Sequence, residues 1–359
     1  MLISNTATPA RLLLAWYDVH KRTLPWRDIN DPYAVWISEI MLQQTRVETV
    51  LAYFPRFMAL FPTVRALAEA PEQTLLKAWE GLGYYSRARN LQKAAKQVTD
   101  DFGGQLPQTA EELRALPGIG PYTAGAIASI AFGEKTSAID GNVMRVVSRL
   151  TGIREDISIP GIARHLASEA AALVPEDRPG DFNQAMMDLG ATVCLPGTPA
   201  CDQCPLSGCC DACAAGDAEM LPIKMKARTP RQIAMGVGLV TSGGRILVSR
   251  RQEKLLGGLF VFVLNEKDDT PAAMGKKLKA LGLSARFQGD IAAAKHVFTH
   301  QVWNMRLMHF TAPEARELSG YQWASLAELD TFPFPTAMKA AKREAEKILA
   351  GNGSRAGAF

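Results

Sequence analysis

All six cysteines of this 359-residue chain fall between Cys194 and Cys213. The first residues, Met1 to Pro9, lack the basic start and apolar run of a signal peptide, so we expect an intracellular, cytoplasmic protein. Thiols that are concentrated in one short segment of such a chain favour a metal site over disulfides. Four of these cysteines have the spacing C-x6-C-x2-C-x5-C, namely Cys194, Cys201, Cys204 and Cys210. The fold must therefore support a loop that is built around a bound metal group.

Two kinds of metal group fit four thiolates, and ligand type alone favours neither. A 4Fe–4S cluster takes one cysteine per iron, and a structural zinc ion takes four sulfur ligands. Cys201–Cys204 and Cys210–Cys213 form two C-x2-C pairs, as zinc knuckles do. The spacer between them is well below the roughly 15–20 residues of the usual zinc pattern, which weakens zinc without excluding it. Cys209 could replace Cys210, but we interpret Cys209 and Cys213 as bystanders.

The first part of the chain has the hydrophobic periodicity of successive helices, without competing strand-like alternation. Thr8 is placed to cap a first helix that begins at Pro9. Thr109 and Glu112 form the pattern of a capping box. Further helices are predicted over Pro32–Thr45, Val47–Leu60, Pro71–Trp79, Tyr84–Asp100, Pro121–Phe132, Gly141–Leu150, Ile162–Leu173 and Asp181–Ala191.

The composition changes after the cysteines, where prolines and basic residues indicate an exposed linker. Strands are then predicted over Ile233–Thr241, Arg245–Arg250, Leu259–Leu264, Ala292–Phe298 and Val302–Phe310, with helices at Ala272–Ala280 and Ala337–Leu349. The predicted fold has two domains, all-α and then α+β. We place the helical domain at residues 1–213, with the metal loop at 194–213. A linker follows at 214–231, the α+β domain at 232–349 and a disordered tail at 350–359.

The composition permits a nucleic-acid partner and excludes other classes. Hydrophobic residues make up 47% and charged residues 21%, which argues against a disordered chain. No run of eighteen apolar residues exists, so we expect no membrane span. The net charge of +4 allows DNA binding without demanding it. The segment between Glu80 and Asp100 has no acid but carries basic residues at helical spacing, just after Tyr84 and Tyr85. That run is either a solvated helix face or a nucleic-acid surface.

A tight turn at Leu116–Pro121 joins two predicted helices and contains Gly118 and Gly120. These glycines can adopt positive φ and allow two backbones to approach each other. Because the next helix begins at Pro121, its free N–H groups can hold a phosphate oxygen of DNA. The alternative is an ordinary helix connector.

Two carboxylates stand out around this turn. Glu39 lies on the mostly apolar helical segment Ile37–Thr45, where burial should raise its pKa. Asp140 opens a helix some twenty residues after the turn, and a helix-opening Asp is most often only an N-cap. The other interpretation is that Glu39 and Asp140 act together as a functional pair of carboxylates.

At these residues the sequence resembles the MutY-type adenine DNA glycosylases of the helix–hairpin–helix superfamily. The resemblance extends from about Leu12 to Leu349. Its motifs are Thr23–Trp26, Ser38–Glu39 with Gln43–Thr45, Gly81–Asn90, the turn, Asp140–Val143, Phe182–Gly190 and the cysteine loop. The resemblance implies a 4Fe–4S cluster held by the four cysteines, and double-stranded DNA as partner. We expect a monomer that associates with the nucleoid.

The resemblance also implies roles for individual residues in removing adenine opposite 8-oxoguanine or, more weakly, guanine. Glu39 matches the acid that protonates the leaving adenine and later assists water. Asp140 matches the carboxylate that stabilises the oxocarbenium-like sugar, and Tyr122 and Asn142 match residues that orient this chemistry. An N-glycosidic bond breaks when the base is protonated and the sugar cation is stabilised, once the base has left the stack.

Further matches concern recognition of the two bases. The adenine pocket corresponds to Trp26, Arg27, Leu42 and Gln184. Contacts with DNA correspond to Gln44, Thr45, Tyr84, Gly118 and Gly120, with Gln44 and Tyr84 beside the damaged guanine. The second domain resembles the family's Nudix-like domain and lacks the R-E-x-x-E-E box of a Nudix hydrolase, so it should bind without hydrolysing. Its 8-oxoguanine loop corresponds to His296, Phe298, Thr299 and His300, where many relatives have serine in place of Thr299.

The sequence leaves two alternative functions open. An endonuclease III-like glycosylase and lyase would need a lysine nucleophile in the turn, whereas Tyr122 stands at that position and Pro121, Thr123 and Met144 offer no amine. A non-catalytic DNA-binding module would leave the pair Glu39 and Asp140 without a use.

Overall fold

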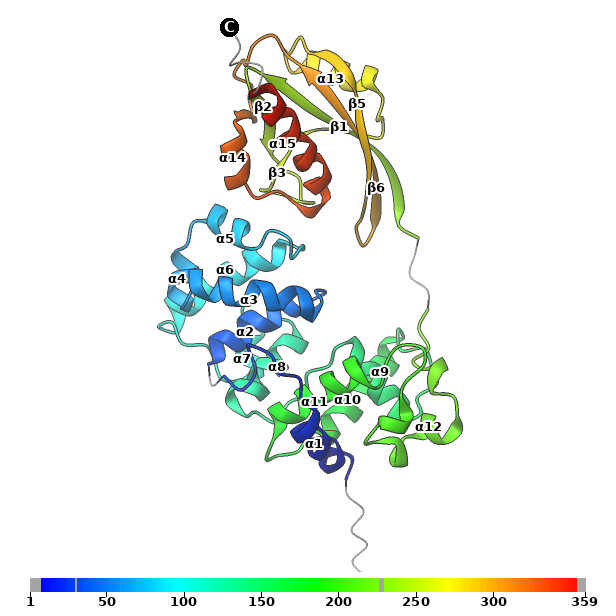
Figure 1. Ribbon diagram of the computed structural model, residues 1–359. Coiled ribbons are helices and arrows are strands. Elements are labelled where there is room, and N and C mark those ends of the chain that lie inside the picture. The colour runs from blue at the N-terminus through cyan, green and yellow to red at the C-terminus, as the bar shows by residue number, and fades with distance from the viewer. Residues whose placement is uncertain (1–7, 30, 226–228, 354–359) are drawn as a thin grey trace, which may run out of the picture. The chain divides into compact units, whose positions relative to one another are not determined.

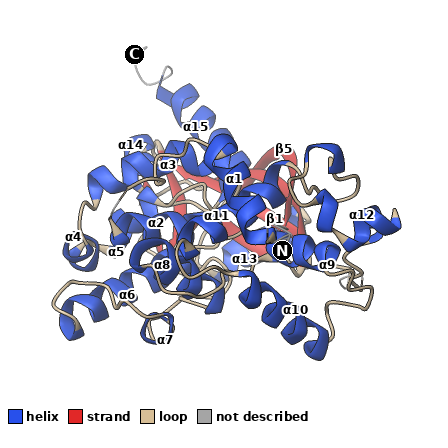
Figure 2. Cartoon of the chain, turned by 90° about the horizontal axis from the view of Figure 1, so that it is seen from below, coloured by secondary structure: helices blue, strands red, loops and turns tan. Residues whose placement is uncertain are grey.

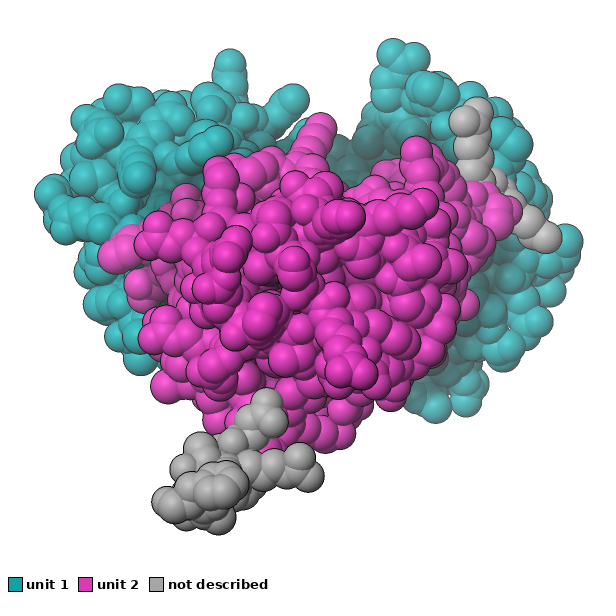
Figure 3. Space-filling view, turned by 90° about the horizontal axis from the view of Figure 1, so that it is seen from above, with its two compact units in different colours: residues 1–70, 89–226 teal, residues 71–88, 227–359 magenta. Residues whose placement is uncertain are grey.

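The computed structural model describes residues 8–29, 31–225 and 229–353. Most of the predicted tail lies outside these residues, although the last helix extends to Gly353, beyond the predicted start of the tail at 350. The chain forms two compact units (Figure 3). One comprises Met1–Ala70 and Arg89–Lys226, and the other comprises Pro71–Ala88 and Ala227–Phe359. Within the described residues, no helix has both the length and the apolar character that crossing a bilayer requires.

The first unit is helical, as predicted (Figure 1). Its longer helices are α1 (Pro9–His20), α2 (Pro32–Leu42), α3 (Val47–Leu60), α6 (Ser86–Asp101), α8 (Pro121–Phe132), α9 (Gly141–Leu150), α10 (Pro160–Leu173) and α11 (Pro179–Thr192). Shorter helices are α4 (Val64–Glu69), α7 (Ala110–Leu113), α12 (Asp211–Ala215) and the 3-10 turns η1 (Cys201–Gln203), η2 (Ser207–Cys209) and η3 (Ala218–Met220). The sequence interpretation missed α4, because a helix of six residues is too short to show a hydrophobic periodicity.

Capping residues explain where two of these helices begin. The Thr8 hydroxyl accepts a hydrogen bond from the backbone N–H of Arg11, and Pro9 occupies the first turn of α1. Asp31 caps α2 in the same way and is followed by Pro32. In both cases a side-chain oxygen satisfies a free N–H while the proline supplies a preset φ.

Helix α2 is buried on almost every side, and this burial determines the character of the site. Residues 33–41 are all buried, including Trp36 and Met41, and α2 packs against α3 and α8. A helix that is apolar all round belongs inside a protein. Any carboxylate on it is therefore removed from water. Helices α1, α9, α10 and α11 share a neighbouring core that includes Leu13, Val146 and Leu189.

All the described strands, red in Figure 2, lie in the second unit and form one sheet. The strands are β1 (Arg231–Ser242), β2 (Arg245–Arg250), β3 (Phe260–Val261), β4 (Val263–Glu266), β5 (Arg286–Val297), β6 (Gln301–Thr311) and β7 (Tyr321–Ala324). The order is β3-β2-β1-β6-β5, with β4 paired to β1 and β7 to β2. Strands β1 and β6 are parallel, and the other pairs are antiparallel.

Alternation along β1 separates two cores on the two faces of the sheet. Val237 and Leu239 face a core with α14 (Leu326–Thr331) and α15 (Lys339–Gly353), whereas Val240 faces a core with α13 (Pro271–Ala280). The helix α5 (Glu72–Ala78) also belongs to this unit, although it precedes the strands by some 150 residues in the chain. The α+β class was predicted correctly, but β7 and α14 were missed.

Segment 71–88 is joined to the C-terminal part of the second unit by specific bonds. The Tyr85 hydroxyl donates to the carbonyl oxygen of Phe334 over 3.1 Å, and a Glu80 carboxylate oxygen accepts from the backbone N–H of Phe334 at 3.2 Å. Lys77 donates to the carbonyl oxygen of Phe332 at 3.2 Å. Sequence order alone could not indicate this membership.

Candidate active site

One pocket of the first unit gathers residues that are far apart in the sequence. Glu39 lines it together with all four residues predicted for the base pocket, Trp26, Arg27, Leu42 and Gln184. The other lining residues are Arg22, Leu24, Val35, Ser38, Val47, Ile130 and Met187. The pocket thus combines apolar walls with a few polar groups, as binding sites for small aromatic ligands do.

Glu39 reaches this pocket from α2 and is only 5% exposed. The Tyr122 hydroxyl, from the first turn of α8, donates a hydrogen bond to Glu39 Oε2 at 2.9 Å. Tyr122 also lies 3.7 Å from the sulfur of Met187, on the pocket wall. The hydroxyl therefore holds the carboxyl group of Glu39 in one orientation beside the pocket.

The pKa of Glu39 is raised from its ordinary 4.5 to about 7. Burial is the largest cause, and the negative charge of Asp140 adds to it. The Tyr122 hydrogen bond and the charge of Arg27 act in the opposite direction but are outweighed. At neutral pH a substantial fraction of Glu39 is consequently a neutral acid that can donate a proton.

Asp140 is the N-cap of α9, so the interpretation of this residue as a helix cap is correct for its local structure. Its Oδ1 accepts from the backbone N–H of Val143 at 2.7 Å, and its Oδ2 accepts from the Asn142 side-chain amide at 3.0 Å. The Arg145 guanidinium in turn donates to Asn142 Oδ1 at 3.0 Å. These bonds fix both carboxylate oxygens of Asp140, whose charge also acts on Glu39. The Asp140 carboxylate can therefore cap α9 and also present a fixed negative charge near Glu39.

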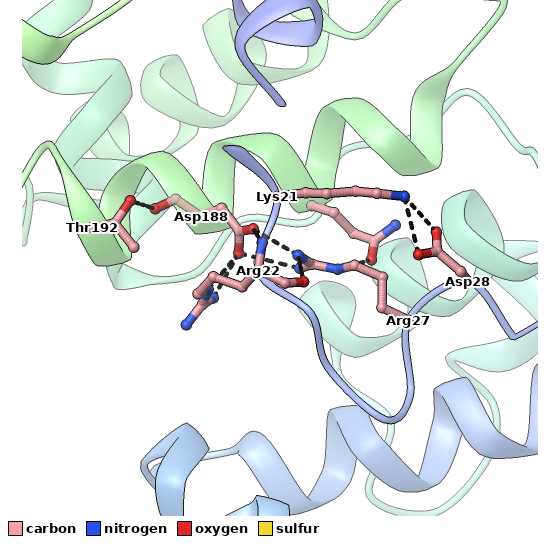
Figure 4. A network of polar contacts seen from close by, with 7 residues as sticks. Lys21, Arg22, Arg27, Asp28, Asp188 and Thr192 are labelled. Carbon is pink, nitrogen blue, oxygen red and sulfur yellow. Dashed lines mark hydrogen bonds and ion pairs between the residues drawn. The ribbon is translucent and has the colours of Figure 1, made fainter. Parts of the chain in front are cut away.

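An ion-pair network joins two arginines of the pocket lining, Arg22 and Arg27, to a buried carboxylate (Figure 4). Asp188 of α11 accepts hydrogen bonds from Arg22 and Arg27, with the shortest distances 2.6 Å and 2.7 Å. Arg27 Nε also donates to Gln184 Oε1 at 3.1 Å. Burial alone would raise the pKa of Asp188, but the two arginines outweigh burial and hold that pKa below its usual range. The sequence interpretation assigned no role to Asp188 or Arg22, although Asp188 follows Gln184 by one helical turn.

The turn between α7 and α8 differs in part from expectation. Gly118 has φ +81°, and a Cβ there would come within 2.6 Å of the Asn90 Cβ, so only glycine fits. Gly120 has φ −87° and ψ 176°, so of the two glycines that can adopt positive φ only Gly118 does so. Its extended backbone leads directly into Pro121, and no side chain caps α8. The N–H groups at the start of α8 therefore remain open to a ligand oxygen.

Two predicted DNA contacts adopt backbone conformations that are unusual for non-glycine residues. Gln44 has φ +56° and Tyr84 has φ +46°. The predicted helix Pro32–Thr45 consequently ends at Leu42, and the one predicted from Tyr84 begins at Ser86. Thr45 follows Gln44 in the same turn, where its hydroxyl donates to the carbonyl oxygen of Gln43. Such strained positions concentrate at functional sites because surrounding structure must hold them.

The predicted 8-oxoguanine residues lie at the β5–β6 hairpin of the second unit. His296 lies next to the last residue of β5 and contacts Phe298 edge-on, and Phe298 packs on Trp303 of β6 at 4.9 Å between ring centroids. Thr299 and His300 form the exposed tip. The hydroxyl groups of Thr299 and Tyr84, which belongs to the same unit, lie 3.3 Å apart.

The cysteine loop surrounds an apolar cavity. Its lining includes all four predicted ligands, Cys194, Cys201, Cys204 and Cys210, and also Cys213. Cys209 is exposed and is not part of the lining. All six thiols are free, and among the described residues no three His, Cys, Asp or Glu side chains are arranged for a single metal ion.

A buried arginine supports the loop from α9. Arg149 donates to the Cys194 sulfur at 3.3 Å and to the carbonyl oxygens of Leu195 and Gly197. A cationic donor on a cysteine sulfur is suited to a thiolate ligand. The sequence interpretation did not identify Arg149, because a basic residue in an amphipathic helix usually faces solvent.

Comparisons with known proteins agree with this geometry. Residues 37–171 match the family model described as HhH-GPD superfamily base excision DNA repair protein, and residues 236–344 match that of the NUDIX domain. An adenine DNA glycosylase of Mus musculus is 37% identical over 393 residues, which cover 91% of this chain and 76% of the mouse protein. One of Rattus norvegicus is 36% identical over 413 residues, covering 97% and 80%.

A solved structure described as a thermostable thymine-DNA glycosylase is also similar. It matches with a TM-score of 0.52 and 29% identity, over 57% of this chain and 95% of that one. The resemblance inferred from the sequence motifs is thereby confirmed, as are the helical domain and the Nudix-like domain that follows it. This chain belongs to the family of adenine DNA glycosylases.

Proposed function

We propose that this protein hydrolyses the N-glycosidic bond of adenine mispaired with 8-oxoguanine, or with guanine, in double-stranded DNA, and that it does so without a lyase step. The observation that carries the proposal is Glu39, a buried acid with its pKa near neutrality, on the wall of a pocket for a flat base. The relatives' name supports adenine as the base that leaves.

Breaking the N-glycosidic bond requires that the negative charge developing on the adenine be neutralised while the positive charge on the sugar is stabilised. Neutral Glu39 donates its proton to the adenine as the bond to the sugar lengthens, so the base leaves uncharged. The Asp140 carboxylate, fixed by Asn142 and the start of α9, stabilises the cationic sugar. Glu39 is then a carboxylate that can take a proton from attacking water. Tyr122 keeps the acid oriented during both steps.

The pocket supplies the binding of the extruded base. We propose that Trp26 and Leu42 contact the faces of the adenine and that Arg27 and Gln184 meet its polar edge. The open N–H groups at the start of α8, after Gly118 and Gly120, would hold a DNA phosphate. Gln44, Thr45 and Tyr84 would contact the DNA around the opposite base.

We further propose that the Nudix-like domain, at residues 232–349 after a linker at 214–231, checks the partner base. The hairpin tip with Thr299 and His300 offers polar atoms, while His296 and Phe298 support it from β5 and the sheet. The Tyr84 hydroxyl next to Thr299 would take part in the same recognition. We expect the protein to act as a monomer.

Four thiols around an apolar cavity, one of them bonded to Arg149, fit a 4Fe–4S cluster held by Cys194, Cys201, Cys204 and Cys210. Bound there, the cluster would cross-link the segment that follows α11 and so support the helices beneath it. The catalytic steps above use none of its chemistry.

The decisive experiment measures adenine release from a duplex with one 8-oxoguanine:adenine pair, with and without alkali. We expect release without strand breakage, and breakage only after alkali. The variant Tyr122→Lys would introduce an amine near the sugar and should produce some strand cleavage. Efficient cleavage by the unmodified protein, with a borohydride-trapped adduct, would instead favour the endonuclease III-like alternative. Tight DNA binding without release would favour a non-catalytic module.

A further inference from the structure

Asp188 is a carboxylate in an environment where an unpaired charge would be very unfavourable. Its side chain is 1% exposed, and it lies on α11 one turn beyond Gln184. Figure 4 shows Arg22 and Arg27 converging on it from the loop after α1. Five hydrogen bonds reach its two oxygens, two from each guanidinium and one from the backbone N–H of Arg22. Such complete pairing specifies one geometry for both arginines.

Arg27 transmits this geometry to the pocket. Its Nη1 and Nη2 bind Asp188, and Nη1 also donates to the carbonyl oxygen of Arg22 at 2.9 Å. The remaining Nε faces Gln184. Because an arginine Nε–H can only donate, the Gln184 atom opposite it must be the oxygen. The amide nitrogen of Gln184 is then the end that is left as a donor for a ligand in the pocket.

Arg27 also acts on the acid itself. The charged or titratable groups that affect Glu39 are Tyr122 from α8, Asp140 ahead of α9 and Arg27 from the loop. Helix α3, which packs against α2 as well, contributes none among the described residues. Arg27 favours the ionised form of Glu39, and Asp188 compensates the charge of Arg27 at 2.7 Å.

We propose that Asp188 is a positioning residue of the adenine pocket. It fixes Arg27, thereby sets which end of the Gln184 amide faces the base, and offsets part of the positive charge that Arg27 brings to the pocket. Nothing in its position allows it to touch the substrate directly, since the two arginines enclose it. The inference rests on the proposed excision of adenine.

The test is the variant Asp188→Asn, which keeps the shape and removes the charge. Single-turnover excision from a saturating 8-oxoguanine:adenine duplex is measured between about pH 5 and pH 9. With Arg27 uncompensated, the pKa of Glu39 should fall, so the alkaline limb of the rate profile should move to lower pH. We expect the rate at neutral pH to drop roughly tenfold or more, which corresponds to the loss of one fixed polar contact and part of the acid form.

Two further variants separate positioning from general support of the fold. Asp188→Glu retains the charge, and should restore the alkaline limb to its parental pH and recover most of the rate. Asp181→Asn is the matched control: Asp181 also lies on α11 and pairs with an arginine, Arg178, but outside the pocket. It should leave the rate and the pH profile unchanged.

The outcomes are distinguishable. A folded Asp188→Asn protein with an unmoved alkaline limb overturns the inference. If that variant fails to fold, Asp188→Glu decides, since a folded Glu variant that is inactive contradicts the assigned role and one within about tenfold of the parent supports it. Failure of the unmodified protein to release adenine would refute the proposed function itself, before any variant is compared.

Discussion

Replacing Glu39 by Gln tests the assignment of the acid in two independent ways, through rate and through stability. Glutamine retains an oxygen that can accept the Tyr122 hydrogen bond, so the local geometry should survive. It cannot donate a proton as an acid or ionise. General acid catalysis contributes roughly 10²–10⁴-fold, and we expect a rate loss of at least that size with DNA binding retained.

The size of the pKa perturbation sets the expected pH dependence. With a pKa of about 7, roughly half of Glu39 is protonated at pH 7, compared with about 0.3% for a carboxyl group at its ordinary 4.5. The rate of the unmodified protein should therefore be level below about pH 6 and fall tenfold per pH unit above about pH 8. Single-turnover release of adenine, measured across this range, gives the profile directly.

The same perturbation affects folding. The folded-state pKa of Glu39 lies above the unfolded one, so the folded protein holds the proton more tightly. The contribution of this proton to the free energy of unfolding is fully present below about pH 4.5 and is lost as the pH rises through about 7. The two pKa values, 4.5 and about 7, differ by about 2.5, and each pKa unit corresponds to about 1.36 kcal/mol, so the contribution amounts to about 3 kcal/mol. Glu39→Gln should consequently be more stable than the parent at about pH 8.5, by up to that amount, and show no such gain near pH 4.5.

Urea unfolding of both proteins at those two pH values measures the difference. A variant that retains a rate within tenfold of the parent would refute Glu39 as the acid. A pH-independent stability difference would refute the buried, neutral carboxyl group, even if the variant were inactive.

Three other changes follow from the geometry. Asp140→Asn should lose most of the rate while still binding the substrate duplex, because the neutral amide no longer stabilises a cationic sugar; unfolding on melting would instead show that its cap on α9 is what matters. Cys210→Ser should abolish iron, about four per chain in the parent, whereas the exposed Cys209→Ser should leave it unchanged; zinc after anaerobic purification would contradict the cluster. Thr299→Ala should reduce the preference for 8-oxoguanine over guanine roughly 2–10-fold, as the loss of one hydrogen bond implies, and Thr299→Ser should preserve it.

Much of the helical half could be predicted because its signals are local. A cap followed by proline marks the start of α1 and α2, and a long apolar stretch marks α2 as buried, which led to a raised pKa for Glu39 before its surroundings were known. The four cysteines that line one cavity were likewise readable from their spacing. Residue types and intervals suffice in such cases.

Other features depend on contacts that no interval encodes. The positive φ values of Gln44 and Tyr84 shorten two predicted helices, because surrounding structure overrides helical propensity there. Asp188 lies within the motif Phe182–Gly190, yet its ion pairs are with arginines more than 160 residues earlier in the chain. The family resemblance, and not the physical pattern, supplied the pocket residues.

The membership of segment 71–88 in the second unit has a consequence for dissecting the protein. The chain enters that unit twice, so it is a discontinuous unit, and no single cut yields both halves intact. A chain ending near Arg231 would keep Tyr85 and Glu80 but lose Phe334, to which both are bonded. A nick near Arg231 in the full-length protein should therefore leave two fragments that co-elute, held by these non-covalent bonds. Differences between a truncated protein and the whole should accordingly be compared with a nicked sample of the whole before they are credited to a missing recognition loop.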